Sequence, residues 1–254
     1  MADGATPIHE TSAIVARFAQ LVVETVVRGC DGGLSIPEAI RMAIERHAVR
    51  GDPTKTPSAA IVVARIVDDR LEVGVLGDCV GVVVRRDAGI LVTDTDPVLR
   101  SLDAVKEVVI AEGMLAGLAY PIARSQIEPI LEAQRRLRNV PGGYWVVADP
   151  PEAAEHVRLV SVPIDSVASI LLSSDGLLRL VDSFRSMTIE GLMEQARHHG
   201  LASLGSLLRR LEALPELLLT APRTSPMDDV TAVFVTVDET IDRSATPRLQ
   251  VVSR

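Results

Sequence analysis

The sequence predicts an α+β fold, a four-layer αββα sandwich in which two antiparallel sheets are flanked by helices. Apolar residues make up 47% of the 254 positions and are spread along the whole length, so the chain can bury one substantial core. Strand-like segments come in groups joined by short turns, whereas helical patterns come in separate blocks. Two antiparallel sheets with helices outside accommodate every block better than a doubly wound parallel sheet does. We expect one domain over residues 1–240 and a polar C-terminal tail over residues 241–254.

Two helices are expected near the N-terminus, after seven residues that have the composition of a turn. Apolar residues recur at helical spacing over residues 14–26, and a glycine-rich segment at 29–33 ends this helix. Ser35 and Glu38 then form the pattern of a capping box, which predicts the start of a second helix. Two further helical blocks are expected at 97–137 and 177–218.

Strands are expected where β-branched residues run together or alternate with polar ones. The first group consists of segments 59–67, 71–75, 80–84 and 90–93. The turns between these segments are short, which predicts a continuous antiparallel meander. Later strands are expected at 144–148, 157–162, 169–173 and 230–237.

Composition and charge exclude several classes of protein. The net charge of −8 provides no basic face for nucleic acid. Cys30 and Cys79 are too few and too far apart for a disulfide framework or a zinc site, so a reducing, cytoplasmic location is expected. No apolar run reaches about 18 residues and the N-terminus lacks a signal-peptide pattern, so no membrane association is expected. Lys55 and Lys106 are the only lysines. Nothing in the sequence fixes the oligomeric state.

Four acidic turns stand out, most of them at the edge of a predicted strand: Asp3-Gly4, Gly77-Asp78, Ser173-Ser174-Asp175-Gly176 and Met227-Asp228-Asp229. Carboxylate oxygens are ligands that Mg²⁺ and Mn²⁺ prefer, and a strand end fixes a carboxylate while its loop leaves it open to substrate. Taken singly, each pattern is also typical of an ordinary turn. Asp175 would then cap a helix, Asp78 would lie at a hairpin tip, and Asp228 would belong to a solvated turn.

These segments follow one another in the order of a known set of motifs. Residues 58–63, Ser-Ala-Ala-Ile-Val-Val, resemble an S-G-T-T-A-V-V strand, and Gly77-Asp78 resembles a G-D-S-R turn. Residues 171–177 are similar to L-L-x-S-D-G-L/I, and residues 228–233 to D-N-I/V-T-x-V. Over nearly its whole length the chain thus resembles the metal-dependent type 2C family of serine/threonine protein phosphatases.

The resemblance implies a site that holds two divalent ions, Mg²⁺ or Mn²⁺. Asp3 matches the aspartate that bridges both ions, and Gly4 would offer its carbonyl to the second ion. Asp175 and Asp228 match ligands of the first ion. Asp78 matches an aspartate of the family's framework, so it is not expected in the metal shell. No catalytic side chain and no other cofactor is expected.

The reaction that the resemblance implies is hydrolysis of phosphoserine or phosphothreonine in phosphoprotein partners by a metal-activated water, without a phosphoenzyme. Many members hold a third ion with the aspartate of a T-x-D-H turn. Thr93-Asp94-Thr95-Asp96 matches that turn in part, and either aspartate is a candidate.

Two departures from the family's pattern leave an alternative open. The family has a strand before D-G-x-G-G with an arginine for the substrate phosphate and an acidic residue for the second metal, whereas this sequence begins two residues before Asp3. Ala5 stands where many members have His, and Thr6-Pro7 replace the paired glycines. We therefore expect either part of a longer protein or an impaired second metal site. The alternative function is a catalytically impaired, phosphatase-like binding or regulatory module. A hydrolase with an N-terminal nucleophile is disfavoured because no processed Thr, Ser or Cys is recognisable.

Overall fold

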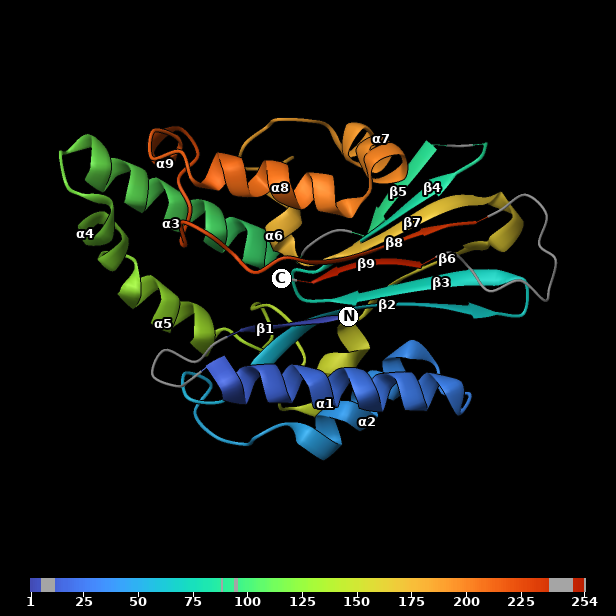
Figure 1. The fold of residues 1–254 in the computed structure, drawn as a ribbon. Coiled ribbons are helices and arrows are strands. Elements are labelled where there is room, and N and C mark those ends of the chain that lie inside the picture. Colours follow the sequence, from blue (N-terminus) through green and yellow to red (C-terminus); the bar gives the residue numbers. More distant parts are fainter. Residues whose placement is uncertain (6–11, 88, 94–95, 238–248, 254) are drawn as a thin grey trace.

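Two antiparallel sheets stack against each other in the computed structural model, and helices cover both outer faces (Figure 1). This arrangement of layers confirms the predicted αββα sandwich. The structure describes residues 1–5, 12–87, 89–93, 96–237 and 249–253.

Each sheet combines strands that are far apart in the sequence. The first sheet has the order β1-β2-β3-β6 and consists of β1 (Ala2–Ala5), β2 (Ser58–Val67), β3 (Arg70–Leu76) and β6 (Arg158–Pro163). The second has the order β5-β4-β7-β8-β9 and consists of β4 (Val80–Arg85), β5 (Gly89–Thr93), β7 (Val167–Ser173), β8 (Thr231–Thr236) and β9 (Leu249–Ser253). All of these neighbouring strands pair in antiparallel fashion.

Helices α1 (Ser12–Asp31) and α2 (Ile36–His47) cover the first sheet, and α7 (Ile189–His199) and α8 (Leu201–Glu212) cover the second (Figure 1). The predicted capping box begins α2: Ser35 Oγ accepts from the Glu38 amide, and Glu38 Oε2 accepts from the Ser35 amide at 2.8 Å. Helices α3 (Pro97–Leu115), α4 (Tyr120–Ser125) and α5 (Glu128–Arg136) extend beyond one end of the sandwich. The shorter helices are α6 (Asp175–Leu178), α9 (Leu217–Thr220) and the 3₁₀ helices Pro151–His156 and Ile164–Ser166.

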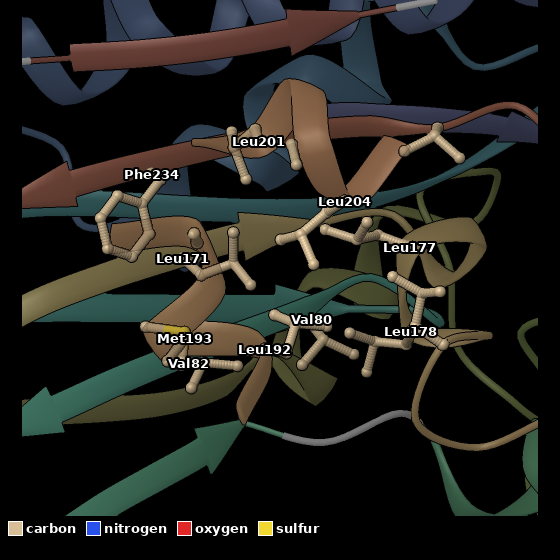
Figure 2. Close-up of a cluster of buried hydrophobic side chains, with 14 of the residues drawn as sticks. Val80, Val82, Leu171, Leu177, Leu178, Leu192, Met193, Leu201, Leu204 and Phe234 are labelled. Atoms are coloured by element: carbon tan, nitrogen blue, oxygen red, sulfur yellow. The ribbon is translucent and has the colours of Figure 1, made fainter. Parts of the chain in front are cut away.

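Buried apolar side chains hold the four layers together. Between the sheets, Val62 and Val73 of the first sheet pack in one cluster with Val83 and Ile170 of the second. A second cluster joins the second sheet to α7 and α8, where Leu171 and Phe234 lie near side chains of both helices (Figure 2). A third joins the first sheet to α1 and α2. Full burial of each such side chain stabilises the fold by about 1.5–3 kcal/mol.

The predicted meander is wrong at one turn, because the chain changes sheets between β3 and β4. β2 and β3 form a hairpin in the first sheet, and β4 and β5 form one in the second. Gly77 begins the crossing with φ +97°, and a Cβ there would lie 2.6 Å from the Ala60 Cβ. Asp78 follows Gly77, so it lies where the two sheets meet at one end rather than at a hairpin tip.

The expected N-terminal turn is instead strand β1, which pairs with β2 so that Asp3 faces Ala60 in the register. The strand expected at 144–148 is also wrong: this segment makes only isolated bridges. The buried Asn139 amide donates to the Val146 and Ala148 carbonyls and accepts from the Val146 amide, so it bonds backbone groups that a strand partner would otherwise take.

The segment expected as a polar tail contributes β9, which pairs with β8. Its Leu-Gln-Val-Val stretch has the apolar content of a strand, which the polar residues before it obscure. The division of the chain at residue 240 stays a prediction. Among the described residues, no helix is long and apolar enough to cross a membrane.

Candidate metal centre

Five of the acidic residues singled out in the sequence, Asp3, Asp78, Asp175, Asp228 and Asp229, line one cavity of about 340 Å³. Asp3 lies on β1, Asp78 between β3 and β4, Asp175 at the start of α6, and Asp228 just before β8. Gly4 lines the same cavity. The fold therefore gathers carboxylates from the edge of one sheet, from the crossing between sheets, and from two loops of the other sheet.

The two loops of the second sheet meet because a glycine lets them approach. The Ser174 amide donates to the Thr231 carbonyl at 3.0 Å, and the Thr231 amide donates to Ser174 Oγ at 3.2 Å. A Cβ at Gly176 would lie 2.3 Å from the Asp229 carbonyl oxygen. Only glycine fits there without a shift of the backbone, so the Asp-Gly pattern has a structural cause at this position.

Gly4 has a similar packing role on β1. A Cβ at Gly4 would lie 2.3 Å from Val15 Cγ1, so glycine allows α1 to approach the strand. Asp3, its neighbour, is partly buried and pairs in register with Ala60 of β2. The Asp3-Gly4 pair thus places a carboxylate at the cavity and a helix against the same strand.

Burial and mutual repulsion raise the pKa values of the clustered carboxyls. Burial raises the pKa of Asp3 to about 7, and the charges of neighbouring carboxylates add to the effect. Burial, followed by the charge of Asp3, also raises the pKa of Asp78 to about 7. The Asp175 side chain is exposed to the cavity. Desolvation by the surrounding protein is nevertheless the main cause that raises its pKa well above the ordinary value, and the negative charges of Asp78 and Asp228 add to this shift. The cluster is short of positive charge.

Asp228 is the exception, because an internal ion-pair network holds it. Burial raises its pKa, whereas the Arg179 guanidinium opposes this shift with Nη2 lying 2.5 Å from Asp228 Oδ2. Arg179 Nη1 also lies 3.1 Å from Oε1 of the fully buried Glu212. Arg209 pairs with Glu212 and donates to the Asp228 carbonyl at 2.7 Å. Asp228 is thus fixed through both its side chain and its backbone.

The chemistry of the donors fits a hard divalent cation, since carboxylate and carbonyl oxygens are what Mg²⁺ and Mn²⁺ prefer. In the part of the chain that the structure describes, however, no group of three or more His, Cys, Asp or Glu side chains is arranged to hold a metal ion. The Arg179 guanidinium lies on Asp228, and a cation bound there would have to replace it. The structure shows that Asp3, Gly4, Asp175 and Asp228 line one cavity. Their assignment as metal ligands stays a prediction.

The turn considered for a third ion is described only in part, because residues 94–95 lie outside the described residues. Asp96 caps α3 by accepting from the Val98 amide at 2.9 Å, and its Oδ2 lies 3.9 Å from Arg158 Nη1. This is a structural role at the helix N-terminus. The third ion stays a prediction.

A larger cavity of about 910 Å³ adjoins the first one. The residues that line both cavities are Asp78, Lys106, Gln134, Asp175 and Asp228. The larger cavity also lies along α3 and the segment that follows α6. A substrate bound there would reach the carboxylate cluster directly.

Sequence reasoning missed three residues of this site: Lys106, Arg179 and Glu212. Lys106 carries a signal that could have revealed it, because a lysine interrupts the apolar stripe of a predicted helix. Arg179 carries no such signal, since its partners lie 33 and 49 positions away in the sequence.

No model of a known protein family matches the sequence, and no curated protein does. Solved structures do match in three dimensions. A bacterial serine phosphatase is 15% identical, with 94% of this chain and 85% of that chain covered and a TM-score of 0.50. The serine/threonine phosphatase Stp1 from Staphylococcus aureus is 14% identical, with 93% and 82% covered and a TM-score of 0.50. The catalytic domain of the serine/threonine phosphatase PstP, in complex with two manganese ions, is 19% identical, with 93% and 86% covered and a TM-score of 0.47. The chain has the fold of the bacterial serine phosphatase and of Stp1.

Proposed function

We propose that this chain is a metal-dependent serine/threonine protein phosphatase of the type 2C family, which acts on phosphoproteins. The observation that carries the proposal is the gathering of Asp3, Asp78, Asp175 and Asp228 around one cavity. Their raised pKa values indicate a site that is short of positive charge, and the fold supports the assignment.

In this proposal Asp3, Asp175, Asp228 and the Gly4 carbonyl hold two Mg²⁺ or Mn²⁺ ions. Bound ions of this kind activate a water molecule and neutralise the charge of a phosphoryl group. The protein's own contribution is to fix the carboxylates at strand ends and loops that packing and hydrogen bonds hold in place. The larger cavity offers room for the residues that flank a phosphoserine or phosphothreonine. We also propose a cytoplasmic location.

A second candidate function is a binding or regulatory module that uses the same fold without catalysis. The ion pair between Arg179 and Asp228 favours it, because a permanently held Asp228 would not be available to a metal ion. The two candidates differ in whether a divalent cation can displace this guanidinium.

Hydrolysis of para-nitrophenyl phosphate and of a phosphoserine peptide tests the proposal. The protein should hydrolyse both with Mn²⁺ or Mg²⁺ and neither with EDTA. Asp175→Asn should lower the rate by about 100-fold or more, as when one electrostatic stabiliser of a transition state is lost. Asp165→Asn, at an exposed aspartate in the 3₁₀ helix before β7, is the matched control and should leave the rate unchanged. Equal rates in EDTA, or an unaffected Asp175→Asn variant, would leave only the binding module.

A further inference from the structure

Lys106 is a buried cation on the inner face of α3. The buried residues of this helix are Leu99, Lys106, Ile110 and Gly113, so the lysine takes a place in a stripe that otherwise lacks charge. Only 5% of Lys106 is exposed. Burial of an ammonium group is unfavourable unless strong partners compensate for the lost hydration.

The partners of Lys106 leave part of its ammonium group unused. Nζ lies 2.5 Å from Asp103 Oδ1 and donates to Gln134 Oε1 at 2.9 Å. An ammonium group has three N–H donors. Among the described residues, no further acceptor contacts the third one. Asp103 is itself 45% exposed on its side chain, so it compensates the buried charge less than an enclosed carboxylate would.

Lys106 lies beside the candidate metal centre, so its unused N–H donor is close to the carboxylate cluster. Lys106 lines both cavities, together with the carboxylates Asp78, Asp175 and Asp228. Carboxylates on this wall repel a phosphate dianion, so an anion that enters needs a positive group on the same wall.

Arg185 is an exposed residue that lines only the larger cavity. The other cations around the two cavities are already engaged. Arg179 pairs with Asp228 and Glu212. Arg223 donates to four backbone carbonyls. Arg100 and Arg135 also have partners within the described structure. Lys106 is therefore the cation of the shared wall whose donors are not all used.

We propose that Lys106 binds the phosphate group of the substrate and of the inorganic phosphate product. This inference rests on the proposed phosphatase function for the substrate, whereas binding of inorganic phosphate can be measured without any catalysis. The third N–H of Lys106 donates to a phosphate oxygen, while Asp103 and Gln134 hold the ammonium group in place. No bond is formed or broken by the lysine, which makes it a phosphate-binding residue rather than a proton donor.

The two lysines of this chain permit a selective experiment. Protein labelled with ¹³C-lysine gives two side-chain Cε signals, which the Lys55→Arg variant assigns. Inorganic phosphate, added with and without Mg²⁺, should shift the Lys106 signal saturably and leave Lys55 unchanged, since Lys55 is exposed and lines neither cavity. A Lys106 signal that stays unchanged at phosphate concentrations that saturate binding by calorimetry would overturn the proposal.

Variants provide a second measurement. Lys106→Met should weaken phosphate binding roughly tenfold or more, the effect expected for a hydrogen bond to a charged group. Lys106→Arg should retain part of the binding, and Lys55→Met should have no effect. Undiminished phosphate binding by a folded Lys106→Met protein would contradict the proposal. If that variant does not fold, the titration of the unaltered protein decides alone.

The outcome separates the two proposals. Metal-dependent hydrolysis with a Lys106 signal that does not respond to phosphate would refute only the role of Lys106. A saturable response of Lys106 in a protein that hydrolyses no phosphoester with any metal would support the phosphate site and refute the phosphatase.

Discussion

At the scale of single residues, Asp228 differs from the other carboxylates of the candidate centre because a guanidinium already faces it. Arg179 stands where positive charge is needed, 2.5 Å from Asp228 Oδ2 and 3.1 Å from Glu212 Oε1. A divalent cation at Asp228 must compete with this arginine. The sequence predicts the aspartate through its motif, but it does not predict the arginine, whose ion pair depends on the tertiary fold.

Arg179→Met tests this competition. Removal of the guanidinium should tighten Mn²⁺ binding roughly two- to fivefold, since a partly exposed ion pair contributes about 1 kcal/mol. Isothermal titration calorimetry measures the affinity. Arg209→Met is the matched control, because Arg209 also pairs with Glu212 but contacts only the carbonyl of Asp228. Both variants should be less stable than the unaltered protein, as each leaves Glu212 with one partner fewer. Weaker metal binding in Arg179→Met alone would show that the arginine positions Asp228 rather than competes for it.

At the scale of elements, turns and loops decide where the acidic residues lie. Periodicity and capping predict α2, and alternation predicts the strands from β2 to β8, because these signals are local. The crossing between β3 and β4 is not predicted, because a short Gly-Asp turn has the same composition whether the chain stays in one sheet or changes to the other. That difference moves Asp78 from a hairpin tip into the cavity.

Gly176→Ala tests the loop contact that brings Asp175 toward Asp228. The added Cβ would lie 2.3 Å from the Asp229 carbonyl oxygen, so the two loops should separate. We expect a loss of about 1–3 kcal/mol of stability from overpacking, and weaker metal binding as the carboxylates move apart. Thermal unfolding with and without Mn²⁺ measures both effects.

Gly205→Ala is the control for this prediction, since Gly205 lies within α8 and a Cβ there meets no atom within 4 Å. It should stabilise the protein by about 0.5–1 kcal/mol, the usual difference between the two residues in a helix. An equally stable Gly176→Ala variant with unchanged metal binding would refute the role assigned to this loop contact.

At the scale of the whole molecule, the candidate centre exists only because two sheets stack with their ends together. Asp3 comes from the first sheet, Asp175 and Asp228 from loops of the second, and Asp78 from the crossing between them. The layered fold can be predicted from composition and periodicity, since helices and strands alternate in blocks. The approach of Asp3, Asp175 and Asp228, which are far apart in the sequence, cannot be predicted in this way. The resemblance to type 2C phosphatases led us to expect that these three residues lie together. The contact of Lys106 with Gln134 and its position between two cavities lie beyond both sources, because side-chain contacts between α3 and α5 leave no local pattern.

The central claim is that this carboxylate cavity holds divalent cations. Anomalous diffraction from crystals grown with Mn²⁺ tests it most directly, because it locates manganese without assumptions about activity. We predict anomalous peaks inside the cavity, with carboxylate oxygens of Asp3, Asp175 and Asp228 at about 2.0–2.2 Å and the Arg179 guanidinium displaced from Asp228. An empty cavity with Arg179 still on Asp228 at saturating Mn²⁺, or manganese bound only elsewhere on the protein, would contradict the claim.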